Sequence, residues 1–258
     1  MILSRRVSLG GVQLDELHEA IVIRSVDPGV PHEEAGAVSR MDGWGMRMTG
    51  QHWESLDAEV TFAINVDKRA IQLRRDIFDA VVAWANRPKN YLRYNGMGDR
   101  RLYIDKVVVP GSGELRNRNA EYTIVFRAYS IPFWETETPT QVSRSNITSG
   151  TVQIDVGGTA PGVLDLEFRN ISGKTIDDFA VTAGNRTMTL SGVGITASET
   201  LVLSHGTDGI LRITSGSRNV YGKMTGADDL YVNPGTVNVS VAATRAGALT
   251  VSNRARWL

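Results

Sequence analysis

Residues 67–87 read DKRAIQLRRDIFDAVVAWANR, the one long stretch of this sequence with a helical pattern. Apolar residues recur in it at spacings of three and four, which places them on one face of an α-helix. They are Ala70, Leu73, Ile77, Val81 and Trp84. Asp67 can cap the first turn with its carboxylate, and Pro88 has no N–H with which to continue the helix. We therefore predict a helix over 67–87 with an apolar face that another element must cover.

The sequence on both sides of this helix predicts the covering element. Residues 56–66 alternate between apolar and polar side chains, and residues 120–128 do the same. A period of two is typical of a strand with one buried face. One helix lying on an antiparallel sheet satisfies both patterns, so we predict an N-terminal β domain with one packed α-helix. Shorter strands are expected at 6–9, 20–26, 90–94 and 101–109.

The composition limits the possible functions. The 258 residues include 28 Lys and Arg against 28 Asp and Glu, so the formal net charge is zero. Nucleic-acid-binding proteins usually have a basic excess, so DNA or RNA is not expected as a main partner. The sequence has no cysteine, which excludes disulfides and thiolate chemistry. No apolar run reaches membrane-spanning length and the N-terminus lacks a signal-peptide core, so we expect a soluble protein made in a cytoplasm.

A glycine-rich segment that ends at about Gly50 has an unusually high content of apolar residues. It contains Trp44, Met46 and Met48, and Trp53 follows just beyond. A loop or long hairpin this apolar needs a partner surface, because large apolar patches rarely stay exposed. Two interpretations remain open. These side chains fold back on their own core, or they contact another subunit.

The sequence changes character after Phe133 and Trp134. Residues 135–150 are polar and have no periodicity, so we predict a linker there, with the two aromatic residues anchoring it on the first domain. Residues 151–258 contain short, evenly spaced strand patterns separated by Gly, Asn and Asp turns, which is typical of a β-sandwich. The expected domains are therefore 1–134 and 151–258, joined by 135–150.

No motif points to a catalytic, cofactor-binding or metal site. Gly192–Ala197 matches the dinucleotide pattern G-x-G-x-x-A, but the next residues have a strand pattern, so we interpret it as a turn. His205–Asp208 offers a histidine near a carboxylate, yet no third ligand stands at a suitable spacing, so solvated loop residues are preferred. Asp228 and Asp229 are neighbours, and turn or cap roles suffice for them.

The order of these elements resembles the distal tail protein of siphophages, the phages with long non-contractile tails, over essentially the whole chain. In the first half the resemblance lies in 56–66, in 67–87, in 91–94 and in 122–134, which ends IPFW. In the second half it lies in GGTAP at 157–161, TMTL at 187–190, DLYVNPG at 229–235 and RARWL at 254–258.

The resemblance implies a fold and an assembly. The fold would be mainly β, with a tail-tube-like N-terminal antiparallel sheet or sandwich, one packed helix, and a galectin-like β-sandwich at the C-terminus. Six N-terminal domains would form a ring by a head-to-tail contact that closes. We expect Trp44, Met46, Met48 and Trp53 to contribute to that contact between subunits.

The resemblance also implies a function. The hexameric ring would join the tail tube protein to the tail hub or baseplate and serve as a docking hub for host-recognition, receptor-binding proteins. DNA would only pass through the ring lumen. The protein would be a structural part of the virion at the tail tip, assembled in the host cytoplasm, with no enzymatic activity, no cofactor and no membrane contact.

Two other classes of function stay open. The first is a carbohydrate-binding module or adhesin that recognises host-surface glycans, in which Tyr221, Tyr231 and Trp257 would stack on sugar rings. Core packing is the more frequent use of such aromatics in a sandwich. The second is an enzyme of unknown type, which we rank last because no nucleophile, base or metal constellation is recognisable.

Overall fold

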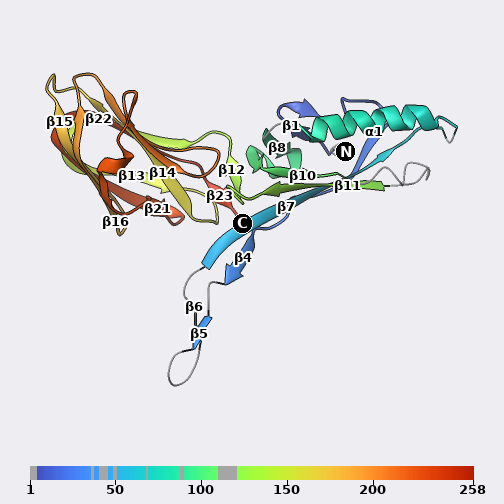
Figure 1. Cartoon of the computed structure of the whole chain (residues 1–258), viewed down its shortest axis with the longest axis horizontal. Helices are drawn as coiled ribbons and strands as arrows, with labels where there is room; N and C mark the ends of the chain where they lie inside the picture. Colours follow the sequence, from blue (N-terminus) through green and yellow to red (C-terminus); the bar gives the residue numbers. More distant parts are fainter. Residues whose placement is uncertain are drawn as a thin grey trace. The chain divides into compact units, whose positions relative to one another are not determined.

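The computed structural model describes residues 5–35, 38–40, 46–48, 51–67, 69–87, 90–109 and 121–258, and between 33 and 52 it describes the backbone alone. The chain divides into two compact units, residues 1–134 with Leu258 and residues 135–257. Both consist mainly of antiparallel strands, and α1 is the one α-helix in the described ranges (Figure 1). This confirms the predicted mainly β fold with a single helix. The two units are described separately.

Unit 1 is built from two sheets and the helix. One sheet has the strand order β10-β11-β7-β3, and the other contains β2-β1-β8-β9. The elements are β1 (Val7–Leu9), β2 (Val12–Gln13), β3 (Ile21–Asp27), β4 (His32–Ala35), β5 (Val38–Arg40), β6 (Met46–Met48), β7 (Gln51–Ile64), α1 (Ile71–Ala85), β8 (Asn90–Tyr94), the 3-10 turn Asn95–Met97, β9 (Arg100–Ile104), β10 (Lys106–Val108) and β11 (Glu121–Ala128).

Aromatic side chains of α1 pack on β11. The ring centroids of Phe78 and Tyr122 are 5.2 Å apart, and those of Trp84 and Phe126 are 5.9 Å apart in an edge-on contact. All four side chains are at most 3 % exposed. The Trp84 indole N–H also donates to the carbonyl oxygen of Val12 at 2.9 Å, which ties the helix to β2. The helix therefore covers the apolar face of the sheet, as its pattern predicts.

The helix is shorter than predicted, and the face that it buries differs from the predicted one. It begins at Ile71 rather than Asp67, whose carboxylate instead accepts the Arg69 backbone N–H at 2.8 Å in the preceding turn. Leu73 is 43 % exposed, whereas Arg74 is 2 % exposed. Phe78, absent from the predicted stripe, explains the difference, because its contact with Tyr122 turns the buried face away from Leu73. The helix ends at Ala85; Pro88, the predicted stop, lies outside the described residues.

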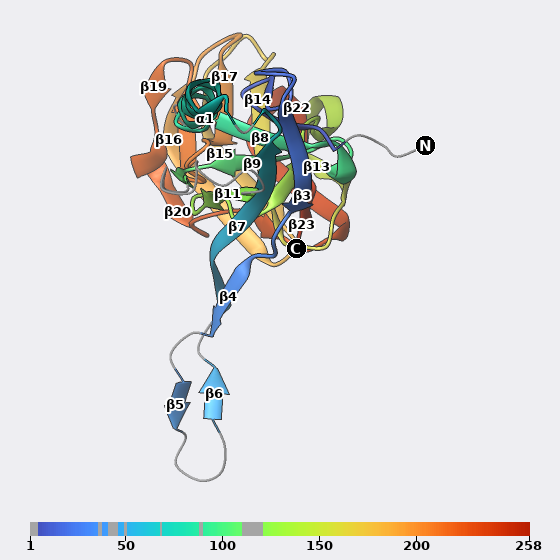
Figure 2. The same cartoon turned by 90° about the vertical axis from the view of Figure 1, so that its right-hand side faces the viewer.

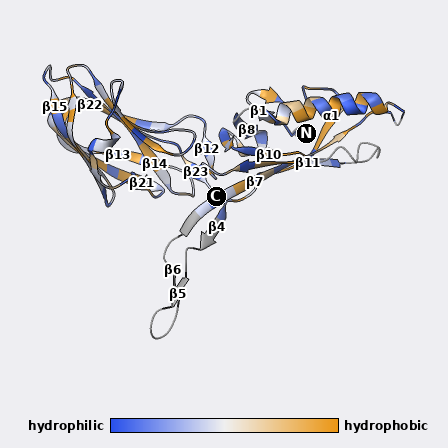
Figure 3. Cartoon of the chain, in the orientation of Figure 1, coloured by the Kyte–Doolittle hydropathy of each residue, from blue (hydrophilic) through white to orange (hydrophobic). Residues whose placement is uncertain are grey.

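Unit 2 consists of strands and short turns. They are β12 (Trp134–Thr136), which starts at the last residue of unit 1, β13 (Thr140–Val156), β14 (Gly162–Asn170), β15 (Ile176–Ala183), β16 (Arg186–Ile195), β17 (Thr200–His205), β18 (Leu211–Ser215), β19 (Arg218–Asn219), the 3-10 turn Tyr221–Lys223, β20 (Met224–Gly226), β21 (Tyr231–Val232), β22 (Gly235–Asn253) and β23 (Arg256–Trp257). Polar and apolar residues alternate along many of them (Figure 3).

Strand β22 belongs to two layers. Its second half, 247–253, pairs with β14 and continues to β17, β18 and β19, while residues 239–243 pair with β15 and continue to β16 and β20. The rings of Phe168 on β14 and Phe179 on β15 lie 4.9 Å apart within one common core. The two layers therefore face each other, which confirms the predicted β-sandwich.

Residues 140–150, predicted as part of a linker, instead belong to β13. This strand pairs with β22 over its whole length, with register shifts between Arg144 and Ser149. Most of its side chains before residue 152 are exposed, and the pairing includes a hydroxyl contact of 3.0 Å between Ser143 and Thr250. An edge strand with a polar outer face has little apolar periodicity, so its sequence reads as a loop.

The two ends of unit 2 meet. The Thr136 backbone N–H donates to the Ala255 carbonyl oxygen at 3.0 Å. Beside it, Arg256 Nε donates to Glu135 Oε1 at 2.8 Å, and each of these two side chains is less than 10 % exposed. A charge pair this buried is costly to break, because removing one partner leaves the other desolvated and unpaired.

Two side-chain truncations test which face of α1 is buried. Ile77→Ala and Leu73→Ala remove the same number of carbon atoms, but Ile77 is 3 % exposed and Leu73 is 43 % exposed. We expect Ile77→Ala to lower the free energy of unfolding by about 2–5 kcal/mol. Leu73→Ala is expected to change it by less than about 0.5 kcal/mol. Urea denaturation followed by circular dichroism measures both, and equal losses would contradict the assigned face.

Candidate assembly surface and polar clusters

Strands β4 to β7 form a ribbon that leaves the sheet of unit 1. Strand β7 pairs with β11 over Leu56–Ala63, but its first residues pair with β4. The β5–β6 pairing continues the same register, because Val38 is three residues beyond Ala35 and Met48 is three residues before Gln51. Figure 2 shows β4 beside the outer part of β7, with β5 and β6 beyond them. We call residues 32–55 the arm.

The residues predicted to contact another subunit are distributed along the arm. Trp44 lies outside the described residues. Met46 and Met48 are the first and last residues of β6. Trp53 lies at the base of the arm, where it is half-buried and its ring centroid is 5.7 Å from that of Phe133. The structure thus brings Trp53 to its own unit's core, while the role of the other three stays a prediction.

The predicted linker anchors, Phe133 and Trp134, are buried in unit 1 at 6 % and 1 % exposure. The Trp134 indole N–H donates to the carbonyl oxygen of Pro28 at 2.9 Å. Pro28 stands in the turn that leads from β3 into the arm, and Gly29 follows it with φ +66°. A Cβ at Gly29 would lie 2.0 Å from the Asp57 carbonyl oxygen, so the turn requires glycine. Phe133 and Trp134 therefore fix both strands at the base of the arm.

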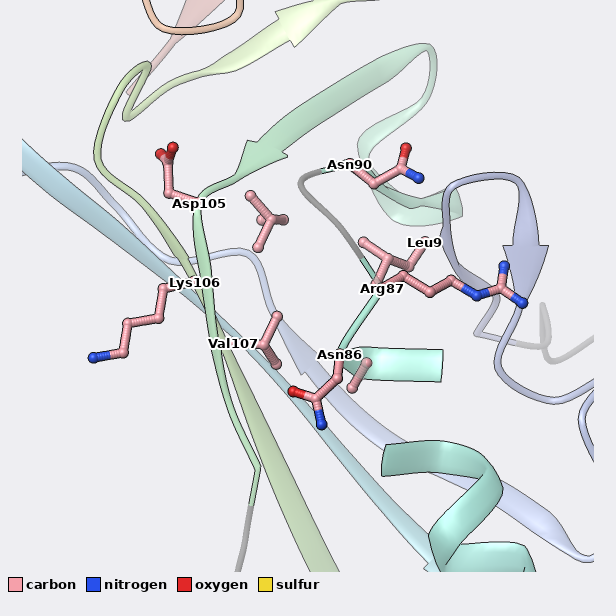
Figure 4. A pocket seen from close by; sticks show the side chains of 9 residues that line it. Leu9, Asn86, Arg87, Asn90, Asp105, Lys106 and Val107 are labelled. Carbon is pink, nitrogen blue, oxygen red and sulfur yellow. The ribbon is translucent and has the colours of Figure 1, made fainter. Parts of the chain in front are cut away.

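A small cavity of about 100 Å³ lies beside the end of α1 (Figure 4). The side chains of Arg87 and Lys106 point away from each other on its two sides. The Asp105 carboxylate accepts three hydrogen bonds of 2.7–2.8 Å, from the backbone N–H groups of Tyr129 and Ser130 and from the Ser130 hydroxyl. The charged groups do not converge on one point, and the carboxylate serves a turn, so we assign the cavity no chemistry.

The G-x-G-x-x-A match, predicted as a turn, lies mostly in strand β16, and the turn begins only at Ala197. Gly192 and Gly194 lie within β16 with φ of 66° and 59°, and the chain enters β17 without a helix. The Glu199 carboxylate accepts the Thr196 backbone N–H at 2.8 Å and binds Arg218 at 3.1 Å. These bonds hold the pKa of Glu199 below its ordinary value. The motif therefore closes the β16–β17 connection and has no dinucleotide-binding geometry.

His205 is not a solvated loop residue, contrary to the prediction. Its side chain is 5 % exposed and lies between two carboxylates. Nδ1 is 2.8 Å from Asp165 Oδ1, and Nε2 is 2.9 Å from Asp229 Oδ1. Burial alone lowers the pKa of His205, but the hydrogen bonds and charges of the two carboxylates outweigh it and raise the pKa to about 9. No sequence signal pointed to this cluster, because its members are 24 and 40 residues apart.

Asn170 is a second buried polar residue that the sequence did not single out. It is 0 % exposed at the end of β14. Its amide nitrogen lies 2.7, 2.9 and 3.1 Å from the carbonyl oxygens of Lys174, Ile195 and Thr196. Its amide oxygen accepts the backbone N–H and the hydroxyl of Ser172 at 2.9 and 2.8 Å. Asn170 thereby joins the loop after β14 to the end of β16.

The aromatic residues considered for sugar stacking lie on three separate elements. Tyr221 begins a 3-10 turn and is 42 % exposed, and Tyr231 on β21 is 47 % exposed. The guanidinium carbon of Arg186 lies 5.2 Å from the ring centroid of Tyr231, in cation–π geometry. Trp257 is half-buried on β23.

Within the described ranges, no group of three or more His, Asp or Glu side chains is arranged to hold a metal ion. The helix that those ranges contain is too short and too polar to cross a membrane.

No family model matches this chain, and no curated protein matches it. Several solved structures are similar to this chain. The crystal structure of the SPP1 Dit protein (gp 19.1) has a TM-score of 0.66 and 13 % sequence identity, covering 98 % of this chain and 99 % of that chain. Two structures of the phage P2 baseplate in its activated conformation, with Ca and with Sr, have TM-scores of 0.44 and 0.45 at 10 % identity. They cover 98 % and 97 % of this chain and the same shares of those chains.

The likeness to SPP1 Dit spans both units. It confirms the resemblance to a distal tail protein at the level of the fold. The P2 baseplate structures are too distant by TM-score to add to this conclusion.

Asn170 and Asn185 form a matched pair for testing the buried amide. Asn170→Ala removes the buried amide that contacts three carbonyl oxygens and accepts from Ser172, so we expect it to lower the free energy of unfolding of unit 2 by about 1–3 kcal/mol. Asn185 is exposed between β15 and β16, and Asn185→Ala is expected to change it by less than about 0.5 kcal/mol. Differential scanning calorimetry compares both variants with the parent chain. An unchanged transition in Asn170→Ala would refute the assigned role.

Proposed function

We propose that this chain is a structural component of a phage tail tip, in which six copies form a ring. The ring joins the tail tube to the tail hub or baseplate and serves as a docking hub for host-recognition proteins. The observation that carries this proposal is the likeness to SPP1 Dit over 98 % of this chain. That protein is described as a paradigm of hub adsorption apparatus in phages that infect Gram-positive bacteria. At 13 % identity the likeness concerns the fold, so the proposal also draws on features of this chain.

The arm supports the assembly part of the proposal. A closed ring needs a head-to-tail contact, in which one surface of a subunit meets a different surface of its neighbour. The sequence of the arm includes Trp44, Met46 and Met48, and Trp53 and Trp134 hold the base of the arm to unit 1. A ribbon with a fixed base and an apolar outer part is suited to reach a neighbour. We infer that residues 37–51 contribute to the contact between subunits.

The main sheet of unit 1 offers a second contact. In the order β10-β11-β7-β3, the described strands β3 and β10 each have a partner on one side. Unpaired edge groups invite pairing with another chain, and a ring removes such edges by bringing them together. Two different edges at opposite sides of one sheet fit a head-to-tail contact, since each subunit supplies one of each.

The proposal assigns a non-enzymatic role at the tail tip of the virion, after assembly in the host cytoplasm. The partners are further copies of this chain, the tail tube protein, the tail hub protein and receptor-binding proteins. DNA only passes through the ring lumen, which accords with the absence of a basic excess in the sequence. Unit 2 is the part to which we assign docking of other proteins.

The first test is the mass of the purified full chain by light scattering after gel filtration, with negative-stain images of the peak. We expect a ring of six times the subunit mass of 28.2 kDa. Because a neighbouring tail protein can act as a template, the same measurement is made after co-expression with the tail tube protein of the same phage. A monomer under both conditions would refute the ring.

The double variant Trp44→Ser, Met46→Ser tests the arm. We expect it to give monomers, because it removes two apolar side chains assigned to the contact between subunits, and its circular dichroism spectrum should match that of the parent chain. Tyr221→Ser serves as the matched control, since it removes an exposed aromatic ring from unit 2 and should leave the ring intact. A ring that survives in the double variant would show that the arm is dispensable for assembly.

A further inference from the structure

The His205 cluster joins three parts of unit 2 that are distant in sequence. His205 is the last residue of β17, Asp165 lies on β14, and Asp229 lies in the segment between β20 and β21. The imidazole is buried and contacts one carboxylate through each ring nitrogen, at 2.8 and 2.9 Å. The side chain thus bridges a β-layer and a connecting segment.

The geometry fixes the number of protons in the cluster. An ionised carboxylate only accepts hydrogen bonds, and a neutral imidazole has one N–H donor and one acceptor. Beside two ionised carboxylates, both contacts are therefore hydrogen bonds only when both ring nitrogens carry a proton. In the neutral imidazole, one of the two contacts would place a nitrogen lone pair against a carboxylate oxygen. The structure assigns His205 as an imidazolium.

The surrounding groups favour the same state. Asp165 Oδ1 also accepts the His205 backbone N–H at 2.9 Å, and Asp229 Oδ1 accepts the Leu230 backbone N–H at 2.6 Å, so both carboxylates are fixed acceptors. On the far side of the segment, Arg186 Nη1 lies 3.4 Å from Asp228 Oδ1 and 3.5 Å from the Asp229 carbonyl oxygen. The charged and titratable groups that face this cluster are Asp165 from β14, Asp228 and Asp229 from the segment, Arg186 from β16 and Tyr231 from β21.

The segment that contains Asp229 is also held by other contacts. Residues 227–232 cross from β20, at the edge of one layer, to β21, which pairs with β14 in the other layer at two positions. Their backbone bonds include Ala227 N–H to the Thr187 carbonyl oxygen at 2.8 Å and Leu164 N–H to the Leu230 carbonyl oxygen at 3.2 Å. Leu230 is 1 % exposed. His205 and Arg186 are thus two side chains that attach this crossing to the strands.

We propose that His205 is a proton-dependent lock: its imidazolium holds residues 227–232 across the two layers of unit 2, and loss of the proton releases them. Release frees the buried Leu230 and separates Tyr231 from Arg186, which alters the outer surface of unit 2. This lock is independent of the proposed ring.

The sign of the pH dependence follows from the carboxylates. They raise the pKa of His205 to about 9 in the folded chain, against an ordinary value of 6.5. The stabilising contribution of the lock is therefore complete below the ordinary pKa and is lost as the pH rises through about 9. The lock is closed at neutral pH and opens in alkaline solution.

Hydrogen exchange of the full chain tests the lock, after correction for the effect of pH on the intrinsic exchange rate. We expect protection of the amides in 227–232 to fall about tenfold or more between pH 7 and pH 10. In His205→Gln their protection should already be low at pH 7 and should not change with pH. His18→Gln is the matched control, because His18 lies in unit 1 and its Nδ1 accepts the Ala20 backbone N–H. It should reproduce the parent chain.

A second measurement does not depend on the folding of a variant. Titration of the ¹⁵N-histidine-labelled parent chain by NMR should show one of its four histidines with a pKa near 9. Asp229→Asn should lower that value and move the loss of protection to a lower pH. A His205 that titrates at or below its ordinary value would overturn the proposal. Unchanged protection of 227–232 from pH 7 to pH 10 would also overturn it.

Discussion

The packing of Phe78 and Trp84 on Tyr122 and Phe126 is the constraint on which unit 1 depends. It fixes α1 on β11, and the neighbouring strand β7 forms the floor of the same core. Strand β7 is 14 residues long, so one continuous strand serves both the core and the arm. The helix therefore does more than cover a sheet. By holding one end of β7, it gives the arm a rigid origin.

Much of this fold follows from periodicity, and the differences have identifiable causes. The helix and its two flanking strands could be predicted because their apolar faces are long and regular. The exposure of Leu73 could not, since it depends on where Phe78 meets a ring from a strand far along the sequence. The first half of strand β13 was missed because hydrogen bonds to β22, rather than apolar burial, order it. Residue propensity and apolar periodicity predict which residues are buried, but they predict backbone pairing at the edge of a sheet poorly.

The candidate sites also differ in how far they could be predicted from the sequence. Phe133 and Trp134 could be singled out from the sequence, because they are adjacent aromatic residues before a polar stretch. Their contacts with Trp53 and Pro28 could not be predicted, because they depend on the turn at Gly29. The Asp165–His205–Asp229 cluster has no local sequence signature, because three separate segments supply its members. Its chemistry is clear only from the two short contacts at the imidazole. Polar clusters of this kind are properties of the tertiary structure.

The meeting of the two ends of unit 2 has a consequence for how such a chain can evolve. The chain enters unit 2 at Glu135, and Arg256 near the end of the unit contacts that residue, so the first and last segments of the unit are neighbours. A domain whose ends are adjacent can be exchanged for another of the same kind without rerouting the chain that carries it. Recombination can then replace residues 135–257 as a cassette, while the unit that holds the helix and the arm keeps its sequence.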